Sequence, residues 1–103
     1  MNEEQRNTEY RQIADKIIDT ANDLIDDKGP AFVGSAALFG IARFCAFSVA
    51  SQADDLTQYE GELAAARQYY LSEFERMLDQ NLEDYKAAFD APLKYEHLMK
   101  SGD

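Results

Sequence analysis

The sequence predicts an all-α fold of three helices, and three observations lead to this prediction. Apolar residues recur with helical spacing in the segments 8–28 and 57–90. The run 30–53 between them is apolar on every side and has one charged residue, Arg43. The two prolines, Pro30 and Pro92, lie at the ends of these segments, where a helix begins or stops. We expect an antiparallel three-helix arrangement with an apolar central helix and a long third helix.

The first helix is predicted to begin at about Thr8 and to end in the segment DDKGP. Its apolar residues return every three or four positions, with the acids facing away: Tyr10, Ile13, Ala14, Ile17, Ile18, Ala21, Leu24 and Ile25. Gly29 can adopt a left-handed cap and Pro30 cannot continue a helix. We therefore expect the chain to turn at these two residues.

The central helix is predicted from Pro30 or Phe32 to about Gln52. Its large side chains point in every direction at 100° per residue: Leu38, Phe39, Ile41, Phe44, Phe47 and Val49. A helix that is apolar all round needs neighbours all round, and two short helices of the same chain would hardly cover it. This pattern favours a homo-oligomer, with a dimer as the expected form.

A membrane span is the other interpretation of this apolar run. As a helix it would measure about 36 Å, which is long enough to cross a bilayer. However, it is rich in alanine, and Arg43 would lie near the bilayer centre at a cost of about 2.5–3.5 kcal/mol. Its flanks, DDKGP and DDLTQYEGE, carry no cluster of positive charge. We therefore predict a buried central helix and no membrane insertion.

The third helix is predicted from about Thr57 to Asp90, after a turn at Asp54–Asp55. Its apolar stripe has spacing close to that of a coiled-coil seam: Leu63, Tyr70, Leu71, Phe74, Leu78, Leu82, Tyr85 and Phe89. The alternative is a break near Asn81, where Asn81 and Asp84 could start a new helix. We expect residues 1–103 to form a single helical domain, with an ordered core of about 8–91 and a loosely packed tail, 92–103.

The face of the central helix around Arg43 reads nearly the same in both directions. Gly40 and Ala46 lie three residues before and after Arg43, and Phe39 and Phe47 lie four residues before and after it. Small residues allow a second backbone to come close, and such symmetry suits an isologous contact between antiparallel copies. The alternative is that the first or third helix covers this face and the symmetry is chance.

Arg43 also requires a partner, because an unpaired guanidinium in apolar surroundings costs several kcal/mol. The third helix offers Asn81 within its apolar stripe, with Asp84 and Tyr85 beside it. A buried asparagine in such a seam fixes helix register. We predict that Arg43 meets Asn81, Asp84 or Tyr85, from its own chain or from a second subunit. An anion-binding site at Arg43 is the alternative.

Composition argues against several classes of function. The chain has 20 acidic and 10 basic residues and a net charge of −10, so its surface repels nucleic-acid phosphates and anionic lipid. It could instead meet a basic surface on a protein partner. One cysteine and one histidine, Cys45 and His97, are too few for a zinc site. We expect no enzyme activity, no metal and no cofactor, and a reducing, cytoplasmic location.

The segments GIARFCAF (40–47) and MLDQNLEDY (77–85), followed by Phe89–Asp90, resemble a family of short bacterial proteins of unknown function. The resemblance covers about residues 10–90. The family pattern has an Ala-Arg-Phe core followed by Asn, and Cys45 stands in place of that Asn here. The resemblance implies a bacterial, cytoplasmic protein and carries over no functional residue.

The function expected from these observations is that of a non-enzymatic protein-interaction module that self-associates. Two alternatives remain at this point. The first is an acidic decoy that occupies the nucleic-acid-binding surface of a basic partner. The second is a small-molecule protein that holds an anion at Arg43.

Overall fold

A computed structural model describes residues 2–90 of the chain. These residues form three α-helices and no strand: α1 (Glu3–Lys28), α2 (Pro30–Ser51) and α3 (Leu56–Asp90). The all-α prediction with a long third helix is therefore confirmed. The predictions made for His97 and for the tail 92–103 lie outside the described residues.

α1 begins earlier than predicted, at Glu3, because Asn2 caps it. The Asn2 side-chain oxygen accepts a hydrogen bond from the Gln5 backbone N–H at 2.8 Å, and the Gln5 side-chain oxygen accepts one from the Asn2 N–H at 3.0 Å. This reciprocal capping box satisfies two N–H groups that have no partner inside the helix. The predicted start at Thr8 was wrong: its hydroxyl donates to the Glu4 carbonyl within the helix, at 3.0 Å.

Gly29 alone connects α1 to α2. Its N–H donates to the Ile25 carbonyl at 2.8 Å, and its carbonyl accepts from the Val33 N–H at 3.1 Å. Its backbone has φ 83° and ψ 149°, so it is not the left-handed helical cap that we expected, although it still needs the freedom of glycine. Pro30 follows as the first residue of α2, where its missing N–H breaks no helical hydrogen bond.

A short turn at Asp54–Asp55 joins α2 to α3, as predicted. The Asp55 carboxylate accepts from the Gln58 N–H at 2.9 Å, and the Gln58 side-chain oxygen accepts from the Asp54 N–H at 2.6 Å. α3 then continues unbroken to Asp90, so the alternative of a break near Asn81 is wrong. The Asn81 side-chain amide donates to the Met77 carbonyl at 2.8 Å, inside the helix.

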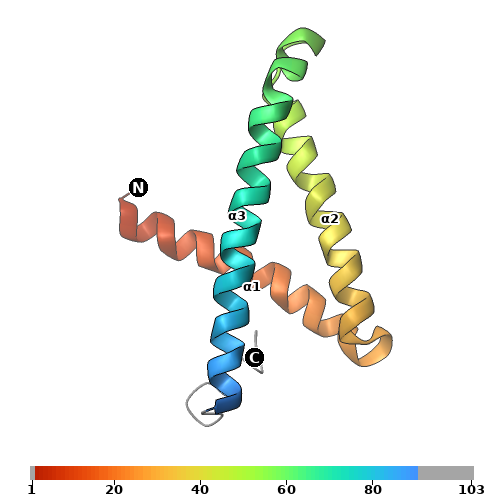
Figure 1. Cartoon of the computed structure of the whole chain (residues 1–103), viewed down its shortest axis with the longest axis vertical. Helices are drawn as coiled ribbons and strands as arrows, with labels where there is room; N and C mark the ends of the chain where they lie inside the picture. Colours follow the sequence, from red (N-terminus) through yellow and green to blue (C-terminus); the bar gives the residue numbers. More distant parts are fainter. Residues whose placement is uncertain (1, 91–103) are drawn as a thin grey trace.

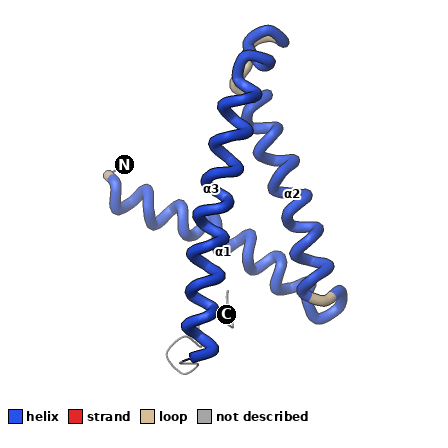
Figure 2. The backbone as a smooth tube through the Cα atoms, in the orientation of Figure 1, coloured by secondary structure: helices blue, strands red, loops and turns tan. Residues whose placement is uncertain are grey.

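The three helices are arranged openly, and both connections between them are short (Figures 1 and 2). α2 and α3 form a V that closes at the 52–55 turn, and α1 leaves the far end of α2 and crosses α3 in the view of Figure 1. Within the described residues α1 packs against α2, and α2 against α3, but α1 does not pack against α3. The radius of gyration is 16.7 Å, whereas a compact chain of this length has about 13 Å.

Few side chains in this open arrangement are buried. Among the described residues only Val33 and Ala88 fall in the buried class. The chain exposes 8959 Å², although a folded monomer of 11.7 kDa exposes about 5,900 Å². The apolar surface that a helical core would normally bury is therefore still in contact with solvent.

Candidate functional site: the Arg43 face of α2

The face of α2 centred on Arg43 is uncovered in the single chain. We call the residues Phe39, Gly40, Arg43, Ala46 and Phe47 the Arg43 face. Phe39 is 73% exposed and Phe47 is 62% exposed. Arg43 and Ala46 are also exposed. Within the described residues neither α1 nor α3 covers Phe39, Arg43 or Phe47, although Gly40 lines a groove with α1.

Gly40 shows how much space is left next to this face. A Cβ atom placed on Gly40 would meet no atom outside its own helix backbone within 4 Å. Glycine inside a helix costs up to about 1 kcal/mol relative to alanine, so its presence calls for a reason. No contact in the described chain supplies that reason.

Arg43 makes no hydrogen bond or ion pair with any residue between 2 and 90. The pairing predicted with Asn81, Asp84 or Tyr85 is therefore not made within the chain. Those three residues lie near the far end of α3, where Asp84 and Tyr85 are half-buried and Asn81 is exposed. The Asp84 carboxylate accepts a hydrogen bond from the Gln80 side-chain amide at 3.1 Å.

Helix length explains why these groups do not meet. α2 and α3 both run away from the 52–55 turn, and each residue advances about 1.5 Å. Arg43 therefore lies about 12 Å from the turn, whereas Asp84 lies about 42 Å from it. α2 itself is only about 33 Å long, so Asp84 projects past its end. An intrachain bond between Arg43 and Asp84 is geometrically impossible in this arrangement.

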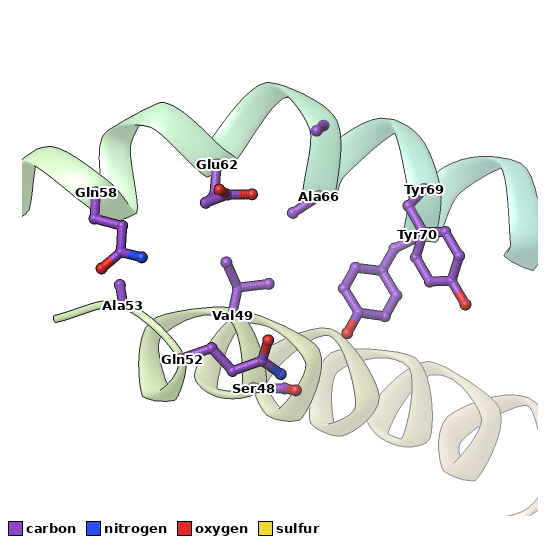
Figure 3. Close-up of a pocket in the computed structure, with 10 residues that line it drawn as sticks. Ser48, Val49, Gln52, Ala53, Gln58, Glu62, Ala66, Tyr69 and Tyr70 are labelled. Atoms are coloured by element: carbon purple, nitrogen blue, oxygen red, sulfur yellow. The ribbon is translucent and has the colours of Figure 1, made fainter.

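α3 consists of two parts with different surroundings. The near half, residues 56–70, lies beside α2, and the groove between them is lined on α3 as far as Tyr70 (Figure 3). The far half, residues 71–90, continues after α2 has diverged (Figure 1). Large apolar residues of the far half are exposed: Leu71 by 53%, Phe74 by 46%, Leu78 by 43% and Leu82 by 59%.

The α2–α3 groove has a volume of about 410 Å³ and was not predicted from the sequence. Val49 and Gln52 of α2 face Glu62 and Ala66 of α3 across it, and Tyr70 points from α3 towards α2 (Figure 3). The tyrosine rings of residues 69 and 70 meet edge to face, with centroids 5.3 Å apart. The feature of the sequence that could have predicted this groove is the pair of small residues Ala65 and Ala66, which allows α2 to approach α3 closely near the turn.

A second groove, of about 420 Å³, lies between α1 and α2. It is lined mostly by apolar side chains, among them Ile17, Leu24, Phe32 and Ala36, and Gly40 of the Arg43 face also lines it. Arg43 lines neither groove. Neither groove of the described chain would therefore enclose a small anion at Arg43.

Charge on the described surface is largely unneutralised. The two ion pairs within residues 2–90 are Lys28–Asp27 at 3.4 Å and Arg76–Glu73 at 3.2 Å. The hydrogen bond from Arg76 and its positive charge lower the pKa of the Glu73 carboxyl, and Glu73 in turn raises the pKa of Arg76. Both are local pairs within one helix and do not join helices.

Other chemistry is sparse in the described chain. Cys45 is a free, half-buried thiol. No group of three or more His, Cys, Asp or Glu side chains within residues 2–90 is placed to hold a metal ion. α2 is the one described helix that is long and apolar enough to cross a membrane, and almost none of it is buried in the single chain.

The comparison with protein families identifies the chain. The family model described as "Protein of unknown function (DUF3144)" matches residues 10–86, and the chain belongs to this family. This confirms the resemblance found at residues 40–47 and 77–85. No curated protein and no solved structure matched the chain.

Proposed function

We propose that this protein is a non-enzymatic protein-interaction module that acts as a self-associated homodimer. One observation carries the proposal: the single chain exposes roughly 3,000 Å² more surface than a folded monomer of its mass. Much of that surface is apolar and belongs to helices rather than to loops. Water opposes such exposure by about 25 cal/mol per Å² of apolar area, so the open chain needs a partner.

A second copy of the chain is the partner that these quantities favour. Obligate homodimers bury about 2,000–5,000 Å² or more in total, and their interfaces resemble a domain core cut in half. The excess area of each chain is sufficient for an interface of this class.

Insertion of α2 into a membrane would be another way to cover it. Arg43 at the middle of the helix and the acidic residues at both ends argue against that solution. The Arg43 face is moreover formed partly by small residues, Gly40 and Ala46, which suit a protein neighbour more than lipid.

Light scattering after size-exclusion chromatography tests the proposal. We expect a mass of about 23 kDa, twice that of the chain, at micromolar concentration. Far-UV circular dichroism should lose helix content on dilution together with the dimer. A well-folded monomer with undiminished helix content would contradict the proposal. The proposal would also be contradicted if the chain floats with neutral lipid vesicles in a density gradient and aggregates when no vesicles are present.

An acidic docking surface is a second candidate function, supported by the unpaired acids of α1. Asp15, Asp19 and Asp23 are exposed and make no ion pair within residues 2–90. Such a surface would occupy a basic, nucleic-acid-binding patch on another protein. A pull-down supports it if bound basic proteins dissociate as salt rises from about 0.05 M to about 0.5 M, because the added ions shorten the range of charge attraction. Retention that is independent of salt contradicts it.

A further inference from the structure

One side of α3 carries exposed residues whose spacing reads the same in both directions. It comprises six residues, which we call the mirrored stripe: Leu63, Arg67, Leu71, Phe74, Leu78 and Leu82. The steps between them are 4, 4, 3, 4 and 4 residues, so the stripe is symmetric about a point between Ser72 and Glu73. Each of its five apolar members is at least 43% exposed. Leu56 and Phe89, seven residues beyond the two ends, continue the symmetry and are also exposed.

Neither α1 nor α2 covers the mirrored stripe in the described part of the chain. α2 meets α3 on the side of Glu62, Ala66 and Tyr70. Because each residue turns the helix by about 100°, the stripe is centred about 110° around α3 from that side. α1 does not pack against α3 within residues 2–90. A second helix can therefore lie along the stripe without displacing α1 or α2.

We propose that the mirrored stripe is the interface of the homodimer, and that it packs against the mirrored stripe of a second copy. The two α3 helices run antiparallel, with the two-fold axis between Ser72 and Glu73. A two-fold contact sets a surface against its own image, so antiparallel helices need a spacing that is unchanged on reversal. In this register Leu71 lies level with the partner's Phe74, and Leu63 lies level with the partner's Leu82. The inference rests on the self-association proposed above and specifies the surface that it uses.

This contact uses only a part of α3 that is bare in the single chain. The stripe ends at Leu82, whereas Asp84 and Tyr85 are half-buried and Ala88 is buried. The proposed interface needs none of these three residues. A specific interface buries at least about 1,000 Å² in total. The excess of roughly 3,000 Å² on each chain is sufficient for a contact of that size.

Arg67 is the one charged residue of the mirrored stripe, and the antiparallel register gives it a counterion. It makes no ion pair within residues 2–90. It lies level with the partner's Leu78, and the partner's Glu75 is three residues further along, about 4.5 Å from that level. Glu75 is an exposed acid at the edge of the stripe and also lacks an ion pair in the described chain. The two-fold axis makes this contact twice, so opposite charges favour this register.

A crossing of two α2 helices at Arg43, which the symmetry of the Arg43 face suggested, is the competing arrangement. It would bring two guanidinium groups together, and like charges repel. Gly40 of that face also lines the groove with α1. Such a crossing would moreover leave the mirrored stripe in water. The contact between two α3 helices instead sets apolar side chains against each other and joins opposite charges.

Distances between spin labels test the register. One nitroxide label is attached per chain, in a Cys45→Ser background, at Gly61→Cys, Ser72→Cys or Glu83→Cys. These three exposed positions lie within about 40° of one another around α3, on the side away from the stripe. In the proposed dimer the two labels are separated along the helix by about 35 Å at position 61, about 2 Å at 72 and about 32 Å at 83. Double electron–electron resonance should therefore give a short distance in the middle and similar, longer distances at both ends.

Two other patterns of label distances would overturn the proposal. Similar distances at all three positions would mean that the two α3 helices run parallel. A steady increase from position 61 to position 83 would place the two-fold axis near the 52–55 turn, as a crossing of α2 helices at Arg43 requires. All three labels occupy exposed positions outside the proposed contact, so the labelled chains should fold and dimerise like the wild type.

A charge exchange within one chain tests the contact between Arg67 and the partner's Glu75. Arg67→Glu alone sets two acids against each other at both sites, and Glu75→Arg alone sets two bases against each other. We expect each single change to raise the dimer dissociation constant about tenfold, measured by sedimentation equilibrium. The double variant restores opposite charges at both sites and should return to within about threefold of the wild type. The two residues lie about 12 Å apart along their own helix, so this recovery arises between subunits.

Arg67→Glu combined with Glu83→Arg is the matched control. It restores the same net charge, but Glu83 is an exposed acid about 150° around α3 from the centre of the stripe. This control should dimerise as weakly as Arg67→Glu alone. If it recovers as well as the exchange with Glu75, net charge alone is responsible and the proposed contact is wrong. Single variants that dimerise like the wild type also overturn the contact.

The wild-type mass separates this inference from the proposed function. A wild-type monomer removes both the self-association and its geometry. A wild-type dimer with one of the two contrary patterns of label distances leaves self-association standing and removes only the mirrored stripe as its interface.

Discussion

The two halves of α3 have the same kind of sequence but different surroundings. In the near half, Tyr59, Ala66 and Tyr70 are half-buried because α2 lies beside them. In the far half, Leu78 is 43% exposed and Leu82 is 59% exposed, and both lie away from the side of α3 that meets α2 in the near half. A continuous apolar stripe on a helix that outruns its neighbours indicates a partner from outside the chain. The exposed apolar stripe of α3, rather than any single motif, therefore carries the strongest indication of assembly.

The largest effect is expected from Leu78→Glu in the far half. In a monomer this exposed position would tolerate a charge with little change. In the proposed dimer two leucine contacts are lost and two charges are buried, so the dissociation constant should rise by roughly 10²–10⁴. Sedimentation equilibrium measures this change. Ser72→Glu, about 120° away around α3, is the matched control and should leave the mass unchanged; a dimer that survives Leu78→Glu would leave the far half without a role.

A smaller effect is expected at the connection between α1 and α2. Gly29 has φ 83° and ψ 149°, a backbone region that residues with a Cβ rarely adopt. Gly29→Ala should therefore lower the free energy of unfolding by about 1–3 kcal/mol. Urea titration followed by circular dichroism measures it. Gly61→Ala, inside α3 and without a neighbour within 4 Å, should instead raise stability by about 0.5–1 kcal/mol. Equal effects of the two changes would contradict this account of the connection.

Gly40→Ala should show whether the Arg43 face is covered in solution. In the single chain Gly40 is as free as Gly61, so alanine should stabilise both helices by up to about 1 kcal/mol. A closely packed partner helix would reduce or reverse the gain at Gly40 alone. Urea midpoints of the two variants, measured at the same chain concentration, give the comparison. Identical gains at both positions would mean that no neighbour approaches Gly40.

The smallest effect is expected from Glu73→Gln, which removes the ion pair with Arg76 inside α3. The pKa of Glu73 is lowered in the folded state, so this pair stabilises the fold at neutral pH and its contribution disappears as the pH falls through the folded-state pKa. Solvent screens both groups, so the contribution is small. The thermal midpoints of the variant and the wild type should differ slightly at neutral pH and coincide in strong acid. A difference between the two thermal midpoints that grows as the pH falls would contradict the lowered pKa of Glu73.

The helices themselves could be predicted because their signals are local. Apolar spacing, Gly29–Pro30 and Asp54–Asp55 located all three helices within a few residues. The start of α1 was missed, although Asn2 and Gln5 form a capping-box pattern that the sequence displays. The apolar spacing before Thr8 is poor, and the cap rather than the spacing decides where that helix begins.

The sequence by itself determined that Arg43 is an isolated charge on a helix with apolar residues all round, that Asn81 interrupts an apolar stripe, and that Asp84 flanks this stripe. Composition and spacing are sufficient for such statements because they depend on hydrogen bonds and side chains within one helix. Only the tertiary structure decided that α1 and α3 leave Phe39, Arg43 and Phe47 exposed and that Asp84 lies about 30 Å too far along for an intrachain bond. Those facts depend on the angles at two short connections and on how far α3 continues after α2 ends. Local patterns do not encode such angles, because they arise from the packing of whole helices.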